Sequence, residues 1–297
     1  PLTALLFAEV CQQAGLPAGV VNIITGDGAT GSHLVNHPGV DKIAFTGSTG
    51  VGKAIAKAIA GTKKSATLEL GGKGANIVFD DAPIDEAVEG IVNGIFFNQG
   101  HVCCAGSRLI LQENIQDEVL EKLKNRMNLI RIGNPMDKNT DLGAINSSAQ
   151  LARIKELADS GDIEGSQRWS PTCSLPTSGF WYPPTIFTGV SQSHRIAREE
   201  IFGPVVSVLP FEDEAEAIEL ANASDYGLSG SIWTNDLGRA MRVSRAIESG
   251  NLSVNSHSSV RFWTPFGGFK QSGLGRALGP DALDAYTETK NVFFATE

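Results

Sequence analysis

The sequence has few cysteines and no long apolar run. Its 297 residues include only four cysteines, with no CxxC pair: Cys11, Cys103, Cys104 and Cys173. This pattern argues against a disulfide framework and a cysteine-rich zinc site, and it favours a reducing, cytoplasmic location. The apolar stretches are interrupted by glycine or charge well below the roughly 18 to 20 residues that span a bilayer, so we expect no membrane helix.

Positive charge is also scarce, and two common types of site are missing. Lys and Arg number 24 against 33 Asp and Glu, which gives a net charge of −9. A nucleic-acid or anionic-membrane surface needs clustered cations, so neither partner is expected. There is no GxSxG elbow of a serine hydrolase. His33 and His37 lack a third ligand, so we expect no metal site.

Glycine, in contrast, is abundant, and apolar patterns of two periods alternate along the first part of the chain. The 33 glycines are expected in tight turns. Short β-branched runs at 20–24, 42–45 and 65–70 separate the helical patterns 2–14 and 53–60. Strands that alternate with helices indicate right-handed crossovers and a parallel sheet. This part therefore predicts half of a doubly wound, Rossmann-like nucleotide-binding domain.

The α/β alternation continues through most of the remaining chain. Strands are expected at 76–79, 108–111 and 251–255 and in a final segment at 291–295, and helices at 84–97, 115–129, 213–223 and 237–248. Residues 160–182 lose this periodicity and collect Gly, Ser, Pro and Trp, so they predict an irregular surface excursion. The expected fold class is α/β throughout.

Two glycine-rich turns could bind phosphate. Residues 26–31 match GxGxxG literally, and residues 47–52 (GSTGVG) also precede a helical pattern. Backbone N–H groups at a helix N-terminus stabilise a phosphate. From spacing alone, each turn is either a dinucleotide site or a plain turn between a strand and a helix.

A thiol and a carboxylate form a candidate catalytic pair. Cys103 lies among small residues, and Glu69 ends a strand, where ligands gather in such sheets. The pair suits formation and hydrolysis of a thioester. The alternatives are that Cys103 and Cys104 are structural thiols and that Glu200 lies in a solvated turn. We expect Arg108 to make a structural ion pair.

Five segments together resemble signature blocks of the aldehyde dehydrogenase superfamily. They are FTGSTGVG at 45–52, LELGGKGANIVFDDA at 68–82, FFNQGHVCCAGSR at 96–108, EEIFGPV at 199–205 and PFGGFKQSGLGR at 265–276. The resemblance runs from residue 1 to about 297. It implies a partial Rossmann-like cofactor domain at 1–70, an α/β catalytic domain at 71–262, and a tail at 263–297 that returns to the cofactor domain and makes oligomer contacts.

The same resemblance implies roles for individual residues. Cys103 would be the nucleophile and Glu69 the general base that activates the deacylating water, while Cys104 would point away into packing. The cofactor-binding residues would be Thr46, Gly47, Ser48 and Gly52 at the pyrophosphate, Leu70 and Gly71 beside the nicotinamide, Glu200 on the ribose hydroxyls, and Phe202 packed nearby. The implied reaction oxidises a small aldehyde to a carboxylic acid with NAD, NADP not being excluded, through a thiohemiacetal and a thioester.

The sequence also departs from the family pattern. His101 replaces the usual Gln before the catalytic cysteine, and Ala277 stands where Glu is common; we expect both to alter packing rather than to abolish the chemistry. Family members are longer, and the first part of the cofactor domain is expected upstream of Pro1. The complete protein is expected to be a homo-oligomer, a dimer or tetramer. The alternative function is a truncated, catalytically silent chain with a scaffold role.

Overall fold

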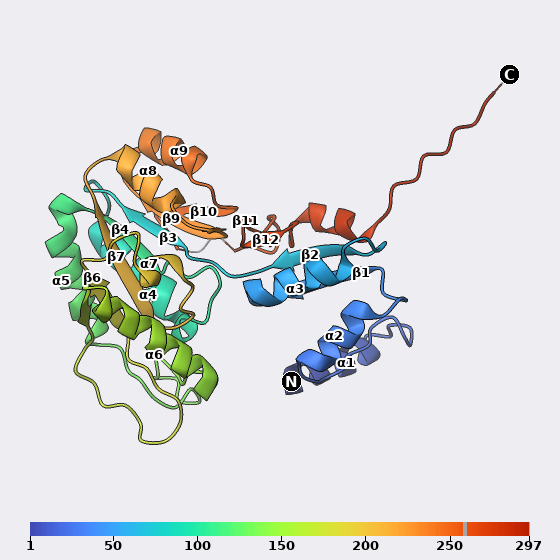
Figure 1. Ribbon diagram of the computed structural model, residues 1–297, viewed down its shortest axis with the longest axis horizontal. Coiled ribbons are helices and arrows are strands. Elements are labelled where there is room, and N and C mark those ends of the chain that lie inside the picture. The colour runs from blue at the N-terminus through green and yellow to red at the C-terminus, as the bar shows by residue number, and fades with distance from the viewer. Residues whose placement is uncertain (258–259, 297) are drawn as a thin grey trace. The chain divides into compact units, whose positions relative to one another are not determined.

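The computed structural model describes residues 1–257 and 260–296 and confirms the α/β class (Figure 1). The chain divides into two compact units, the smaller formed by 1–44 and 53–66 and the larger by 45–52 and the chain from 67 onward. The divisions at 70 and 262 that the resemblance implies stay a prediction. Residues 258, 259 and 297, which fall within the expected catalytic domain and tail, lie outside the described residues.

The smaller unit is mainly helical. It contains α1 (Leu2–Gln13), α2 (Gly28–Asn36) and most of α3 (Thr49–Ile59). Asp27, inside the literal GxGxxG turn, caps α2 by accepting the Ala29 N–H at 2.9 Å. The strand expected at 20–24 is wrong: these residues form no strand, and Val20 and Ile24 are 64% and 59% exposed. A β-branched run forms a strand only when it has a neighbouring strand or a packed face.

A three-stranded sheet has the order β1-β2-β12. Its strands are β1 (Lys42–Thr46), β2 (Ser65–Glu69) and β12 (Gly273–Leu274). The glycine-rich segment near the C-terminus thus returns to pair antiparallel with β2, and Gly273 lies opposite Glu69. This pairing fixes the backbone around Glu69.

The larger unit is organised by a seven-stranded sheet of order β10-β9-β3-β4-β7-β6-β5. Its strands are β3 (Ala75–Val78), β4 (Arg108–Gln112), β5 (Gln167–Trp169), β6 (Thr185–Thr188), β7 (Val205–Phe211), β9 (Ser229–Trp233) and β10 (Asn251–Val254). All neighbours are parallel except β5 and β6. A small antiparallel pair joins β8 (Tyr226–Gly227) to β11 (Phe269–Lys270). The α/β alternation predicted from residue 71 onward thus forms a largely parallel sheet, whereas the parallel sheet predicted from strands at 20–24, 42–45 and 65–70 lacks the first of these strands.

Helices cover both faces of this sheet, as a parallel sheet requires (Figure 1). One apolar cluster joins the sheet to α4 (Ile84–Phe96) and α5 (Gln116–Met127), and another joins it to α8 (Glu214–Asn222) and α9 (Leu237–Ala246). The other helices are α6 (Ser148–Ile163), α7 (Arg195–Arg198) and the short 3-10 helices η1 (Phe97–Gly100), η2 (Glu113–Ile115) and η3 (Pro280–Tyr286).

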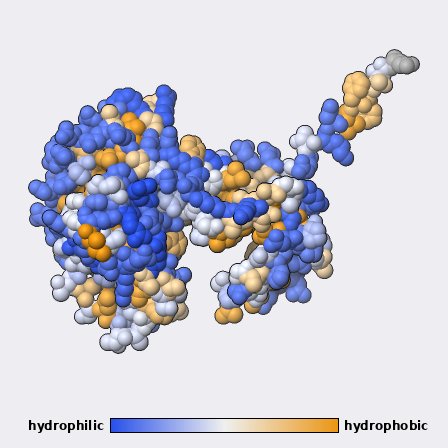
Figure 2. Space-filling view, viewed as in Figure 1, coloured by the Kyte–Doolittle hydropathy of each residue, from blue (hydrophilic) through white to orange (hydrophobic). Residues whose placement is uncertain are grey.

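Three expectations for this unit need correction. Residues 160–163 belong to α6 and 167–169 form β5, so the irregular excursion is shorter than 160–182. Residues 291–295 form no strand, and Phe293 and Phe294 are 84% and 80% exposed. Apolar surface is visible on the extended C-terminal segment in Figure 2. Arg108 is buried and makes no ion pair within the described part of the chain; its guanidinium instead donates to the carbonyl oxygens of residues 73, 220 and 221.

Within residues 1–257 and 260–296, we find no helix that combines the length and apolarity needed to cross a bilayer.

Candidate active site

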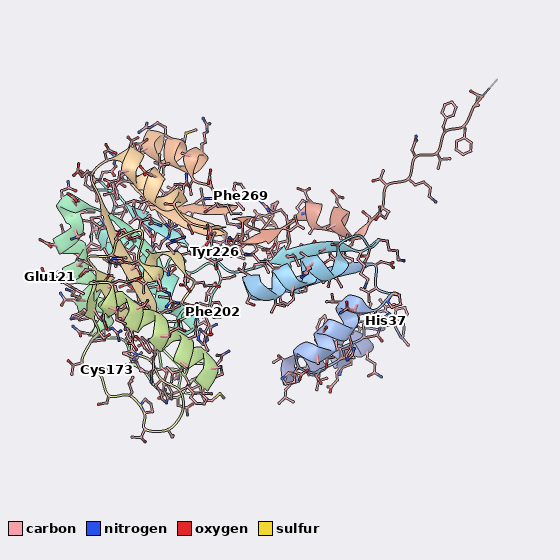
Figure 3. All side chains as sticks on the ribbon, viewed as in Figure 1. His37, Glu121, Cys173, Phe202, Tyr226 and Phe269 are labelled. Atoms are coloured by element: carbon pink, nitrogen blue, oxygen red, sulfur yellow. The ribbon has the colours of Figure 1, made fainter. Side chains whose placement is uncertain are left out.

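A cavity of about 620 Å³ lies within the larger unit. It is lined by Thr46, Gly47, Ser48, Leu70, Gly71, His101, Val102, Cys103, Gln150, Arg153, Glu200, Ile201 and Phe202. The structure therefore brings together eight of the ten residues expected at the site, from four separate segments of the chain. Gly52 and Glu69 do not line it. Phe202, on one wall, is labelled in Figure 3.

The turn at 46–48 forms one wall because its glycines allow close packing. A Cβ on Gly47 would lie 2.4 Å from the Phe45 ring, and one on Gly52 would lie 2.5 Å from the Leu70 side chain. The Gly47 N–H donates to the Glu69 carbonyl at 3.0 Å, which ties the turn to the end of β2. Helix α3 begins directly after this turn, so the cavity wall includes the electropositive N-terminus of a helix.

Glu200 is held as a hydrogen-bond acceptor at this cavity. The Gly72 N–H donates to its Oε1 at 3.0 Å, and a Cβ on Gly71 would lie 2.3 Å from Oε2. Burial raises the pKa of Glu200, while the Gly72 N–H and the charge of Lys73 oppose this rise. Glu200 therefore does not lie in a fully solvated turn, because the backbone of Gly71 and Gly72 packs against its carboxylate.

The adjacent cysteines face different cavities. Cys103 lines the 620 Å³ cavity, whereas Cys104 lines a second cavity of about 260 Å³. Cys104 is therefore not enclosed in packing. A hydrogen bond between the two thiols raises the pKa of Cys103, as burial does, and lowers the pKa of Cys104 to about 7.

Glu69 is a buried carboxylate without a partner. Its side chain is 8% exposed, and neither carboxylate oxygen has a hydrogen bond within the described part of the chain. Burial raises the pKa of Glu69 to about 7, and the charge of Arg276 opposes that rise. A carboxyl group with a pKa near the working pH can both take up and release a proton, which suits a general base.

Val102 separates the two cavities, since it lines both. The smaller cavity is lined by Asn93, Gly94, Phe97, Val102, Cys104, Ser229, Gly230, Ser253, His257 and Val260. The segment 102–104 thus has accessible space on two sides, with Cys103 at the larger cavity and Cys104 at the smaller one.

Sequence reasoning missed several residues of the larger cavity. Gln150 donates through Nε2 to the carbonyl oxygens of Ile201 and Phe202, both at 3.0 Å. Arg153 adds a cation, which is bound to Glu199 at 2.5 Å. Both lie on α6, and no sequence signal marked them because this helix was not anticipated.

The residues support a dinucleotide site better than a metal site. Among the described residues, no three His, Cys, Asp or Glu side chains are placed to hold a metal ion. The turn at 46–48 could hold phosphate, and Glu200 could accept hydrogen bonds from ribose hydroxyls, since its carboxylate is buried at the wall. The literal GxGxxG turn belongs to the smaller unit, where Asp27 caps α2.

Comparisons with known proteins identify relatives over nearly the whole chain. The model of the aldehyde dehydrogenase family matches residues 1–292. An aldehyde dehydrogenase of Emericella nidulans is 46% identical over 99% of this chain and 60% of its own length. The NAD+ complex of an aldehyde dehydrogenase from Bacillus cereus has a TM-score of 0.97 at 40% identity, covering 100% of this chain and 61% of that one. An NAD-dependent aldehyde dehydrogenase from Sinorhizobium meliloti has a TM-score of 0.95 at 41% identity, with 98% and 58% covered.

The chain thus spans about 60% of the length of the curated relatives it matches. The match by the family model covers nearly every residue, and the solved structures share the fold at identities of 40% and above. The chain belongs to the aldehyde dehydrogenase family.

Proposed function

We propose that this chain carries the catalytic thiol of an NAD(P)-dependent aldehyde dehydrogenase that oxidises a small aldehyde to a carboxylic acid. The observation that supports it most is the shared cavity of Cys103, Glu200 and the turn at 46–48. The Cys103 thiol can act as the nucleophile. The Glu200 carboxylate and the helix N-terminus after the turn at 46–48 can bind a dinucleotide in the same cavity.

The reaction begins at Cys103. Its sulfur, once deprotonated, attacks the carbonyl carbon of the aldehyde, and the carbonyl oxygen takes the negative charge of a thiohemiacetal. When bound, NAD(P)+ supplies the acceptor for the hydride that leaves this carbon. Loss of the hydride leaves a thioester on Cys103.

Glu69 serves the second half of the reaction. Its carboxylate takes a proton from a water molecule, whose oxygen attacks the thioester carbon, and the Cys103 sulfur leaves. The pKa of about 7 supports this role, because the group holds and releases protons near neutral pH. Water and aldehyde are consumed, and an acid, a reduced dinucleotide and a proton are produced.

Several sequence expectations remain part of this proposal. We propose Thr46, Gly47, Ser48 and Gly52 at the phosphates, Leu70 and Gly71 at the nicotinamide, and Phe202 packed beside it. The division into a cofactor part at 1–70, a catalytic part at 71–262 and a tail from 263 is also retained, as are NAD as the preferred dinucleotide, a homo-oligomer and a cytoplasmic location.

The test compares two adjacent thiols in a version of the chain extended upstream to the length of its relatives. NADH formation from a short aldehyde is followed for Cys103→Ser and for the matched control Cys104→Ser. We expect Cys103→Ser to lose at least a thousandfold in kcat and Cys104→Ser to lose less than tenfold. Retained turnover in Cys103→Ser would refute the proposed nucleophile. An inactive parent protein would instead support the catalytically silent alternative.

A further inference from the structure

The rings of His101 and Phe202 form a parallel, offset stack on the wall of the Cys103 cavity. Their centroids are 5.4 Å apart and their planes differ by 3°. Both residues line the cavity that contains Cys103 and Glu200. Only Phe202 was expected at the site. The structure adds the His101 ring, against which Phe202 packs.

The backbones that carry the two rings are fixed independently of the stack. Phe202 has a left-handed φ of 54°, and its carbonyl accepts the Gln150 amide at 3.0 Å. On the other side, the His101 N–H donates to the Asn98 carbonyl at 2.9 Å, and the Asn98 side chain donates to the His101 carbonyl at 3.2 Å. Replacement of the imidazole therefore leaves both backbone segments with their own hydrogen bonds.

The two segments also approach each other closely below the rings. Gly100 has a φ of 73°, and a Cβ there would lie 2.2 Å from the Gly203 carbonyl oxygen. Glycine at this position brings the segment before Cys103 against the segment after Glu200. His101 and Phe202 are the chain neighbours of these two glycines, so the stack lies next to a close backbone contact.

One nitrogen of the His101 imidazole makes no hydrogen bond among the described residues. This atom, Nε2, is buried. Burial lowers the pKa of His101, so the ring is neutral at pH 7. Nε2 makes no hydrogen bond in the described chain, whereas the ring stacks on Phe202. We therefore assign the role of this side chain to its aromatic surface.

We propose that His101 is a positioning residue, which holds the ring of Phe202 in place for the nicotinamide half of a dinucleotide. This rests on the proposed function, because Phe202 is placed beside the nicotinamide only there. An aromatic pair contributes about 0.5 to 1.5 kcal/mol beyond area burial, which corresponds to an affinity change of about 2- to 10-fold. His101 acts through Phe202 and takes no part in the chemical steps.

Protonation of His101 gives a readout that a merely structural role would not change. Oxidised nicotinamide is a cation and reduced nicotinamide is neutral, so an imidazolium in the same stack disfavours NAD+ more than NADH. The other charged or titratable side chains on this cavity are Cys103, Arg153 and Glu200. Because they are unchanged in a His101 variant, their contribution is removed when the variant is compared with the parent.

The experiment measures dissociation constants of NAD+ and NADH by calorimetry at pH 7.5 and pH 5.5, in the upstream-extended chain. The variants are His101→Ala, His101→Phe and His101→Gln, with the exposed His33→Gln as the matched control. At pH 7.5 we expect His101→Ala and His101→Gln to bind NAD+ about 2- to 10-fold more weakly, His101→Phe to bind within 2-fold of the parent, and kcat at saturating NAD+ to change less than 2-fold.

When the pH is lowered through the pKa of His101, the parent and His33→Gln should lose more affinity for NAD+ than for NADH, and His101→Phe should show no such difference. Equal affinities in all variants at both pH values would overturn the inference. The inference would also be overturned if His101→Phe bound NAD+ weakly while His101→Gln bound it as tightly as the parent, because an aromatic ring would then be dispensable at this position. A parent that binds no dinucleotide would contradict the proposed function, which is a different outcome.

Discussion

Replacing Glu69 by Gln tests whether burial of this carboxylate costs stability. The pKa of Glu69 is raised from 4.5 to about 7 in the folded chain. A raised carboxyl pKa means that the folded state keeps a proton that the unfolded state has lost. Its stabilising effect is present below pH 4.5 and disappears as the pH rises through 7. At pH 8 the ionised Glu69 carboxylate therefore destabilises the folded state.

The magnitude follows from the shift. One pKa unit corresponds to about 1.36 kcal/mol, so the full effect is about 3 kcal/mol. Water access and the charge of Arg276 reduce it, and we expect Glu69→Gln to raise the free energy of unfolding by about 1 to 3 kcal/mol at pH 8. The gain should shrink to below about 1 kcal/mol at pH 5, where the folded carboxyl is already protonated.

Urea unfolding of the 297-residue chain, followed by tryptophan fluorescence at both pH values, measures this difference. The matched control is Glu121→Gln, an exposed carboxylate on α5 that is labelled in Figure 3. It should change the free energy of unfolding by less than about 0.5 kcal/mol at either pH. The reasoning would be refuted if Glu69→Gln were less stable than the parent at pH 8. It would also be refuted if the substitution changed the free energy of unfolding by the same amount at pH 8 and at pH 5.

Two further variants test the cavity and the core. Glu200→Gln should raise the KM for NAD+ by about 10- to 100-fold, because hydrogen bonds to a charged acceptor are worth about 1.5 to 3 kcal/mol, and steady-state kinetics of the extended chain would show this. Trp233→Phe removes the donor to Asn76 Oδ1 at 2.8 Å, and it should cost about 1 to 3 kcal/mol in urea unfolding; a change below about 0.5 kcal/mol would show that this buried hydrogen bond is dispensable.

The fold was predictable where packing follows a simple period. The strands at 76–79 and 108–111 were expected because buried parallel strands are continuous apolar runs, and they occur as β3 and β4. Helix α6 was missed because its buried residues, such as Ile154 and Leu157, alternate with many polar ones. The strand expected at 20–24 failed for the opposite reason: its residues have strand propensity, but no neighbouring strand pairs with them.

The site was predictable from motifs only in part. Cys103 and Glu200 were named from their sequence blocks, and both line one cavity. The stack of His101 on Phe202 depends on how two distant loops meet, and the fit of Gly100 against Gly203 that sets it is a three-dimensional property. Likewise, the buried state of Glu69 arises from its pairing with Gly273 near the other end of the chain.

The most direct test of the central claim is to locate the acyl group during turnover. The upstream-extended chain carrying Glu69→Gln is mixed with NAD+ and a short aldehyde, quenched in acid within one turnover, digested and mapped by mass spectrometry. Slowed deacylation should let the thioester accumulate, with one oxidised substrate residue attached to Cys103 and one NADH formed per acylated chain. An acyl group on Cys104, or NADH formed steadily without any acylated cysteine, would contradict the account.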